Sequence, residues 1–201
     1  MTNNIQSIQL LIEEADKHKL AGKHADAIKI CENILNQDLF CIEAYEEIGD
    51  NYLSLKKYDK AKKALEKALE INPLSPNANY LLGFTYSAIG HFPKSIEFLD
   101  KANEIEPNHP EILRCLGWSI FHGDNKKKGI IILERASSLC PEDVLILCDL
   151  GVCHLNDKNF KRSIKLFDKV IKIEPENEKA QECLKAAKFF HTEFKKLKKK
   201  K

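Results

Sequence analysis

Three reactive side chains, Cys148, Cys153 and His154, lie within seven residues of one another. Thiolate and imidazole are ligands that zinc accepts, and a thiol beside an imidazole is the arrangement of a cysteine nucleophile with its base. On a helix, spacings of five and one do not bring three side chains to one point, because residues three or four apart share a face. We expect these residues to pack in a core or along a surface. A base–thiol pair that uses His122 has no support in the sequence.

Other motifs of catalysis are missing from the sequence. Seven cysteines are scattered along it, with no Cys-x-x-Cys pair and no haem-attachment motif. It contains no glycine-rich phosphate loop, no His-Glu-x-x-His and no nucleophile elbow. We predict no catalytic residue, no metal site and no cofactor, and therefore a protein that is not an enzyme. The odd number of thiols favours free cysteines in a reducing compartment.

A period of 34 residues organises the chain instead. Two residue types keep this step: Gly49, Gly83, Gly117 and Gly151, then Pro73, Pro107, Pro141 and Pro175. A segment of this length is one helical hairpin, which cannot bury its apolar face alone and must stack on its neighbours. The period therefore predicts an all-α solenoid. With the glycine at position 8, the repeats run 8–41, 42–75, 76–109, 110–143 and 144–177.

Each repeat contains two apolar stripes at helical spacing. In the second repeat these are Tyr45, Ile48, Gly49 and Tyr52, followed by Ala61, Leu65 and Ala68. Proline at position 32 ends the second helix, and the small residue at position 8 lets the paired helix approach. Gly129 stands in the fourth repeat where the second repeat has Ala61. Inside a helix, this glycine costs about 1 kcal/mol relative to alanine.

The pattern resembles the tetratricopeptide repeat family: small at position 8, aromatic at 11, alanine at 20 and 27, proline at 32. The resemblance covers about 170 of 201 residues, although no repeat has tryptophan at position 4 and His154 replaces the aromatic residue at 11. It implies a right-handed superhelical solenoid of about five helix-turn-helix hairpins. Residues 1–7 would be an N-terminal tail, and residues 178–201 a capping helix with a lysine-rich tail.

The resemblance also implies that the first helices of the repeats line a concave groove that binds partners. The groove residues would be Glu46, Asp50, Tyr80, Phe84, Ser87, Arg114, Trp118, Phe121, Cys148, Val152 and Leu155. The groove is acidic in its first part and aromatic or apolar afterwards, and grouped exposed aromatics mark partner sites. Trp118, the one tryptophan, either contacts a partner or packs as filler against Phe84 or the neighbouring helix. The carboxylates of Glu43, Glu46 and Asp50 either bind a basic partner or form a solvated helix face.

One ligand of the family is excluded by charge. Some members hold the C-terminal carboxylates of heat-shock chaperones with a clamp that begins with lysine and asparagine at positions 5 and 9. Ile12 and Asp16 occupy these positions in the first repeat, and Glu46 and Asp50 occupy them in the second. Neither pair supplies the positive charge that a carboxylate requires.

The last segment forms a narrow apolar seam that is longer than one repeat helix: Cys183, Ala187, Phe190, Phe194 and Leu197. We predict self-association into a homodimer, or a partner contact, through Phe190, Phe194 and Leu197; fraying is the alternative. The ending KKLKKKK is either a solubilising tail or a weak, salt-sensitive attractor for nucleic acid or an acidic membrane. We expect no specific nucleic-acid partner, because no aromatic platform accompanies it.

The bulk composition favours a cytoplasmic protein. The net charge of +2 divides into +6 from residue 178 onward, where nine lysines face three acids, and −4 before it. No leader and no run of about 20 apolar residues appears, so we expect no transmembrane segment. The first hypothesis for function is an adaptor or scaffold that binds a peptide or helix of another protein, apolar with a basic end. The alternative is a dedicated chaperone for an unstable or secreted client.

Overall fold

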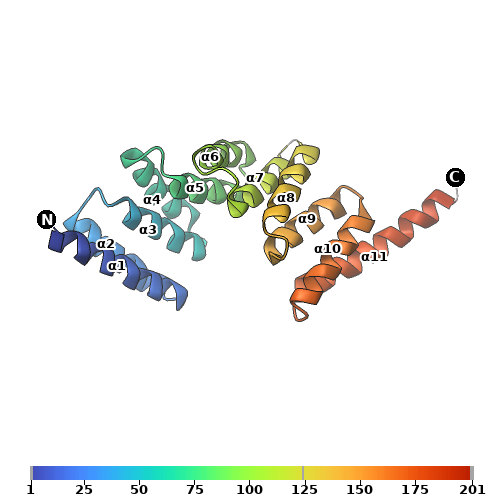
Figure 1. The fold of residues 1–201 in the computed structure, drawn as a ribbon, viewed down its shortest axis with the longest axis horizontal. Helices are drawn as coiled ribbons and strands as arrows, with labels where there is room; N and C mark the ends of the chain where they lie inside the picture. Colours follow the sequence, from blue (N-terminus) through green and yellow to red (C-terminus); the bar gives the residue numbers. More distant parts are fainter. Residues whose placement is uncertain (1, 124, 200–201) are drawn as a thin grey trace. The chain divides into compact units, whose positions relative to one another are not determined.

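The computed structural model describes residues 2–123 and 125–199, and within them it forms eleven helices and no strand, which confirms the all-α prediction. The helices are α1 (Thr2–Leu20), α2 (His24–Gln37), α3 (Ile42–Ser54), α4 (Tyr58–Ile71), α5 (Pro76–Ala88), α6 (Phe92–Ile105), α7 (Pro110–His122), α8 (Lys126–Leu139), α9 (Val144–Asn156), α10 (Phe160–Ile173) and α11 (Glu178–Lys199). Figure 1 shows them as a succession of antiparallel pairs.

The chain divides into two compact units, residues 1–107 and 108–201, which we call the N-terminal and C-terminal units. In the N-terminal unit α1 pairs with α2, α3 with α4 and α5 with α6, and α3 also contacts both α1 and α5. In the C-terminal unit α7 pairs with α8 and α9 with α10; α9 contacts α7, and α11 packs on α10 and α9. The odd-numbered helices therefore lie side by side as one layer in each unit.

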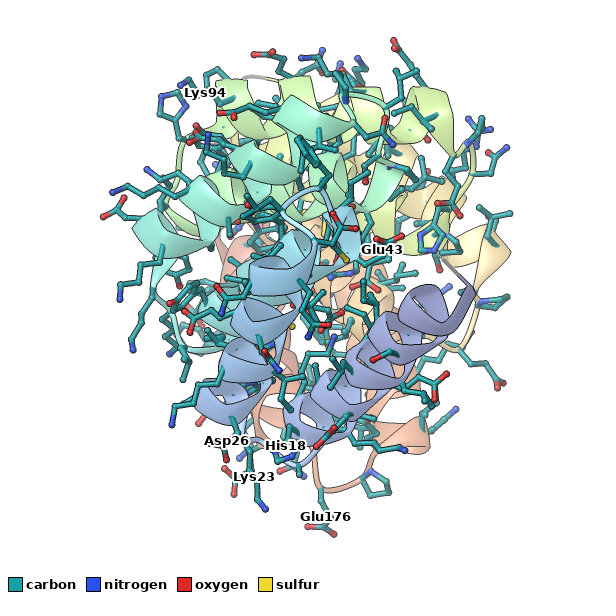
Figure 2. All side chains as sticks on the ribbon, turned by 90° about the vertical axis from the view of Figure 1, so that its left-hand side faces the viewer. His18, Lys23, Asp26, Glu43, Lys94 and Glu176 are labelled. Carbon is teal, nitrogen blue, oxygen red and sulfur yellow. The ribbon has the colours of Figure 1, made fainter. Side chains whose placement is uncertain are left out.

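The hairpin turns use residues in the left-handed region of backbone space. Gly22 and Gly90 have φ values of +72° and +77°, and lysine takes this role at Lys56 and Lys158. A residue with positive φ lets the chain leave a helix abruptly, which is why glycine is common there. Figure 2 labels His18 and Asp26 at the first of these turns, where the imidazole Nδ1 lies 3.9 Å from a carboxylate oxygen.

The periodic prolines mark helix ends, as the sequence predicts. The second helices α4, α6, α8 and α10 each end two residues before the proline of their repeat. A proline lacks the amide hydrogen that the helical ladder needs, so the helix cannot continue through it. Polar side chains then begin the next first helix in two repeats, where Ser75 caps α5 and Asp143 caps α9.

Glycines inside the helices allow paired helices to approach closely, and Gly49 and Gly129 illustrate two kinds of contact. A Cβ atom added at Gly49 would lie 2.6 Å from Leu65 of the paired helix. At Gly129 the neighbour is main chain, because an added Cβ would lie 2.6 Å from both the Gly117 oxygen and the Phe121 nitrogen. Gly129 is therefore more than a departure from the repeat pattern: it lets α7 and α8 come together.

Two further details of the sequence prediction concern the ends. Residues 2–7, expected to form a tail, belong to α1. The predicted capping segment contains α11, which has 22 residues compared with 14 in α10. Within the described ranges, no helix combines the length and apolar character that a bilayer crossing demands.

Candidate functional site

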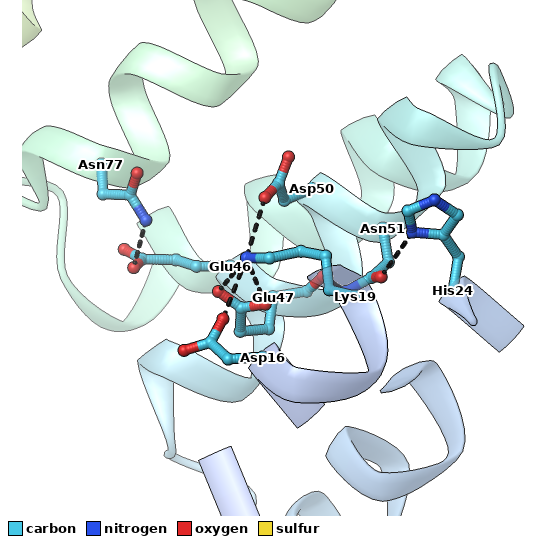
Figure 3. Close-up of polar contacts among 8 residues, drawn as sticks. All are labelled: Asp16, Lys19, His24, Glu46, Glu47, Asp50, Asn51 and Asn77. Carbon is cyan, nitrogen blue, oxygen red and sulfur yellow. Dashed lines mark hydrogen bonds and ion pairs between the residues drawn. The ribbon is translucent and has the colours of Figure 1, made fainter. Parts of the chain in front are cut away.

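Carboxylates on the odd-numbered helices of the N-terminal unit surround one lysine. The Lys19 ammonium of α1 lies 2.8 Å from Glu47, 3.1 Å from Asp16 and 3.1 Å from Asp50 (Figure 3). Glu47 and Asp50 come from α3, one helical turn apart, so both reach the same point. One positive charge among three negative charges leaves this part of the layer with an excess of two negative charges. Glu43, at the start of α3, is exposed and adds another.

The environment of this cluster shifts the pKa values of two of its groups. Burial alone would lower the pKa of Lys19, but its hydrogen bonds to Glu47 and Asp16 outweigh burial and hold that pKa above its usual range. Burial raises the pKa of Glu47, although the Lys19 ammonium opposes this effect. The cluster thus keeps the Lys19 ammonium charged, and its carboxylates outnumber that one cation.

Glu46 does not belong to the exposed acidic surface, contrary to the sequence prediction. Its side chain is only 9% exposed and accepts hydrogen bonds from the Ser75 hydroxyl and, at 2.8 Å, from Asn77 Nδ2. Ser75 also caps α5 by accepting from the Ala78 amide at 3.0 Å. Glu46 therefore joins α3 to the first turn of α5. Its partners lie 29 and 31 residues further along the chain, at the end of the same repeat and the start of the next, so no local pattern around Glu46 indicates them.

Ser75→Ala is expected to lower the free energy of unfolding by about 2 kcal/mol. The substitution removes a helix cap, worth about 1 kcal/mol, and takes one donor from a buried carboxylate, which costs a further ~1 kcal/mol. Asn125→Ala is the matched control, since Asn125 caps α8 through the Lys128 amide alone. Urea unfolding at neutral pH measures both variants; equal losses would show that the link to Glu46 contributes nothing.

An aromatic pair follows the carboxylates on the next odd-numbered helix. Tyr80 and Phe84 of α5 are half-buried, and their ring centroids lie 6.4 Å apart. Both rings pack on the core between α3, α4 and α5, and Ser87, one turn further along, is half-buried as well. α5 contacts α3 directly. We call these rings, with Asp16, Lys19, Glu43, Glu47 and Asp50, the acidic-aromatic surface.

The C-terminal unit places Trp118 at the surface but buries Phe121. Trp118 of α7 is half-buried, packs on the core with Phe121 and Leu150, and lies 4.2 Å from the His122 ring, centroid to centroid. Phe121 is 3% exposed. The prediction that the Phe121 side chain is exposed in the groove is therefore wrong. Phe121 lies against α8 at the close approach to Gly129, where an added Cβ would come within 2.7 Å of the Phe121 Cβ.

Arg114 is engaged in an ion pair between first helices. Its Nη1 lies 2.9 Å from Asp149 of α9, and its Nη2 lies 3.1 Å from Glu111 of α7. The Arg114 and Asp149 side chains are 14% and 23% exposed. Burial raises the pKa of Asp149, and the Arg114 guanidinium opposes that rise. The repeat pattern points to Arg114 but not to Asp149, which lies one repeat period plus one residue further along.

Half-buried apolar residues of α9 complete the second candidate surface. Cys148, Val152 and Leu155 are all half-buried, and with Trp118 they form what we call the tryptophan surface. A hollow of about 360 Å³ lies beside it, lined by Phe121, His122, Gly123, Lys126 and Asn156.

The cysteines of this surface and of the core are not activated. Burial raises the pKa of Cys148 to about 11 and that of Cys153 to about 12, so both thiols stay protonated at neutral pH. Cys153 and His154 are buried, as the core-packing interpretation predicts. All seven cysteines are free. No three metal-binding side chains gather anywhere in the described parts of the chain.

The last helix shows a second aromatic cluster. Phe160 of α10 is buried and lies 6.4 Å from Phe190 and 5.6 Å from Phe194, centroid to centroid. Phe194 therefore packs on its own unit and does not overhang it. Leu197 remains 64% exposed, and Phe189, which the sequence seam did not include, is 61% exposed. Phe189 lies on a different face of α11 from the apolar seam, so the seam pattern does not include it.

Comparison with known proteins agrees with this architecture. Residues 52–117 and 145–177 match two family models, each described as a tetratricopeptide repeat. Comparison with curated protein sequences gives no significant match.

Three solved structures illustrate the likeness of fold. YrrB, described as a TPR protein with an unusual peptide-binding site, is 20% identical with a TM-score of 0.66, over 87% of this chain and 90% of that chain. TTC0263 of Thermus thermophilus, a thermophilic TPR protein, is 15% identical with a TM-score of 0.77. The match covers 90% of this chain and 99% of that chain. The APC/C hetero-tetramer Cut9-Hcn1 is 14% identical with a TM-score of 0.83, over 92% of this chain and 37% of that one. At such identities the likeness is one of fold.

Proposed function

Because this chain belongs to the tetratricopeptide repeat family, we propose that it is a protein-interaction adaptor whose odd-numbered helices hold a peptide or helix of another protein. Proteins of this repeat family are generally non-catalytic scaffolds. The observation that carries the proposal is the acidic-aromatic surface, where half-buried rings stand beside carboxylates that outnumber their one internal cation.

The chemistry of the acidic-aromatic surface suits an apolar segment with a basic residue. Tyr80 and Phe84 can bury a large ring area against a partner while losing little side-chain conformational entropy. Aromatic residues of this kind dominate the binding energy of many interfaces. The carboxylates around Lys19 already hold one ammonium, and their excess negative charge attracts a second cation. A partner that places a leucine or an aromatic residue near a lysine or arginine would contact both the rings and the carboxylates of this surface.

The tryptophan surface is a separate candidate contact in the C-terminal unit. Trp118, Val152 and Leu155 are half-buried, so a partner can remove further apolar area from water there. Arg114 and Asp149 are satisfied by each other, and we assign them to holding α7 and α9 together. The likeness to YrrB, whose description includes a peptide-binding site, supports peptide recognition in general and no particular sequence.

Selection of random peptides on the immobilised full-length chain tests the proposal. We expect enriched peptides to contain an aromatic or aliphatic residue with lysine or arginine nearby. Phe84→Ala is expected to weaken them at least tenfold, since truncated hot-spot residues commonly cost 2 kcal/mol or more. Trp118→Ala should do the same for any peptide that occupies the tryptophan surface.

Ile131→Ala is the control for these substitutions. Ile131 is an apolar side chain that is 64% exposed and lies on α8, in the other helix layer. Its truncation should leave affinity unchanged. If Phe84→Ala and Trp118→Ala bind the selected peptides as the native chain does, neither surface is the binding site.

The chaperone alternative uses the same surfaces and differs in what happens to the partner. A client should be insoluble or degraded when it is expressed without the chaperone, whereas an adaptor's partner should stay soluble alone. Co-expression with an identified partner separates the two. The seven free thiols support a reducing compartment such as the cytoplasm as the place where either role is carried out.

A further inference from the structure

The two units carry opposite charge. Residues 1–107 contain 12 lysines and 17 acidic residues, a formal charge of −5, whereas residues 108–201 contain 20 lysines and arginines and 13 acidic residues, a formal charge of +7. These values account for the total of +2. The negative excess includes the carboxylates of the acidic-aromatic surface. The positive excess includes the lysines of α11 and those that follow it.

The terminal segment of α11, residues 185–197, presents apolar and basic side chains together. Phe189 and Leu197 are each more than 60% exposed, and the Phe189 ring touches Phe190 at 5.5 Å between centroids. Lys195 and Lys196 are exposed, and the sequence continues with a run of lysines. Figure 1 shows this end of α11 extending past α10. Phe189 and Leu197 are therefore largely uncovered by their own unit, whereas Phe190 and Phe194 pack on Phe160.

Each exposed group on this segment has a counterpart on the acidic-aromatic surface. The partner chemistry that surface requires is an apolar side chain beside a cation. Phe189 and Lys196, seven residues apart and so on one face of α11, are that combination. Lys196 is held at 2.8 Å by Glu193 in an exposed pair. Such pairs contribute little to stability, so exchanging that carboxylate for others costs little.

We propose that the terminal segment of α11 of one copy docks on the acidic-aromatic surface of a second copy, giving head-to-tail self-association. This inference rests on the proposed function, because it names a partner for the same surface. The contact is heterologous: each copy retains one unused surface and one unused segment. Association therefore continues into longer chains unless the geometry closes a ring. The attraction is electrostatic in part, so salt weakens it.

Two full-length variants separate the two sides of the contact. The donor variant, Phe189→Ala/Leu197→Ala, removes exposed apolar side chains from α11. The acceptor variant, Glu43→Lys/Asp50→Asn, changes the charge of the acidic-aromatic surface by three. The control variant, Glu66→Lys/Asp59→Asn, makes the same change of charge on α4, in the other helix layer. Circular dichroism and thermal melting first establish that each variant is folded.

Sedimentation velocity from about 1 to 200 μM, at low and high salt, gives the readout. For the native chain and the control variant we expect an average mass that rises above 23.0 kDa with concentration and falls with added salt. The donor and acceptor variants should each associate at least tenfold more weakly. Mixed together, they should form a complex of two chains that grows no further, because only one competent surface and one competent segment remain.

Three results would overturn the proposal. The native chain could stay at 23.0 kDa throughout the concentration range. The acceptor variant could associate as the native chain does, which would indicate pairing of α11 with α11. The native chain could bind phosphatidylserine vesicles through Phe189 and Leu197 while remaining a monomer without lipid, which would assign the segment to a membrane surface.

This test and the test of the proposed function fail in different ways. If self-association is missing but Phe84→Ala still abolishes binding of the selected peptides, the acidic-aromatic surface is a binding site and α11 is not its ligand. If Phe84→Ala changes neither peptide binding nor self-association, the acidic-aromatic surface is not a binding site.

Discussion

Arg114→Ala is expected to lower the free energy of unfolding by about 3 kcal/mol at neutral pH. The Arg114–Asp149 pair is 2.9 Å long and mostly withdrawn from solvent. Removing the guanidinium leaves a largely buried carboxylate without a cation, and breaking buried pairs in this way costs about 3–5 kcal/mol. We choose the lower end because 23% of the Asp149 side chain remains exposed. Urea unfolding of the native and variant chains measures the difference.

The loss of unfolding free energy caused by Arg114→Ala should depend on pH. Burial raises the pKa of Asp149 in the folded state and Arg114 opposes the rise, so the variant's pKa is higher still. A carboxyl with a raised folded pKa binds its proton more tightly when folded, and protonation therefore favours the folded state. The loss is complete above the variant's folded pKa and shrinks as pH falls from there to the raised folded pKa of Asp149 in the native chain, because the unfolded pKa is common to both chains.

The double variant Arg114→Ala/Asp149→Asn is the control for this prediction. It removes the unpaired charge, so it should be more stable than Arg114→Ala alone at neutral pH and should lack the recovery at low pH. A loss of stability that is the same at every pH, or a double variant no better than the single one, would show that Arg114 acts through packing alone.

Gly129→Ala is expected to destabilise the chain by about 2 kcal/mol, against the ordinary preference for alanine in a helix. Helix propensity alone predicts a gain of about 1 kcal/mol. The added Cβ, however, would meet main-chain atoms of α7 at 2.6 Å, and the backbone cannot rotate away as a side-chain end can. Overpacking of this kind costs about 1–3 kcal/mol, occasionally more. The shift in the thermal melting temperature measures the result.

Ser163→Ala is the matched control, since Ser163 occupies the position of the fifth repeat that Gly129 occupies in the fourth. Ser163 is fully buried, and its hydroxyl has no hydrogen-bond partner among the described residues. Alanine there adds no atom and removes an unsatisfied polar group, so a gain of up to about 1 kcal/mol is expected. If Gly129→Ala is as stable as the native chain, then α7 and α8 can move apart at no cost.

Periodicity predicts the helices because it acts within one hairpin. The regular spacing of the glycines and prolines marks where helices meet and where they end. These requirements arise within a single hairpin and recur in each of the others. Gly49 against Leu65 and the helix ends before each proline follow from this reasoning. The family resemblance then supplies the layer on which ligands would lie.

Exposure of individual side chains is harder to predict because it depends on residues of neighbouring helices that are distant in sequence. The sequence predicts an exposed Glu46, which is instead buried by two donors at the start of α5, Ser75 and Asn77. Phe121 was expected at the surface and turns into the core, since a glycine in the paired helix leaves room for it. Phe189 was missed because it lies off the apolar seam. Each case requires knowing which residues of the neighbouring helix are small or polar.

The single indole of this chain belongs to the C-terminal unit alone. Trp118 is its only tryptophan, so emission excited at the red edge of aromatic absorption reports one unit, whereas far-ultraviolet dichroism reports helices in both. Unfolding curves recorded by the two signals coincide only if the units melt together. Repeat chains are held by nearest-neighbour contacts, so any divergence of the two curves would reveal how cooperatively the array behaves. The native sequence thus carries its own optical label for asking whether it unfolds as one body.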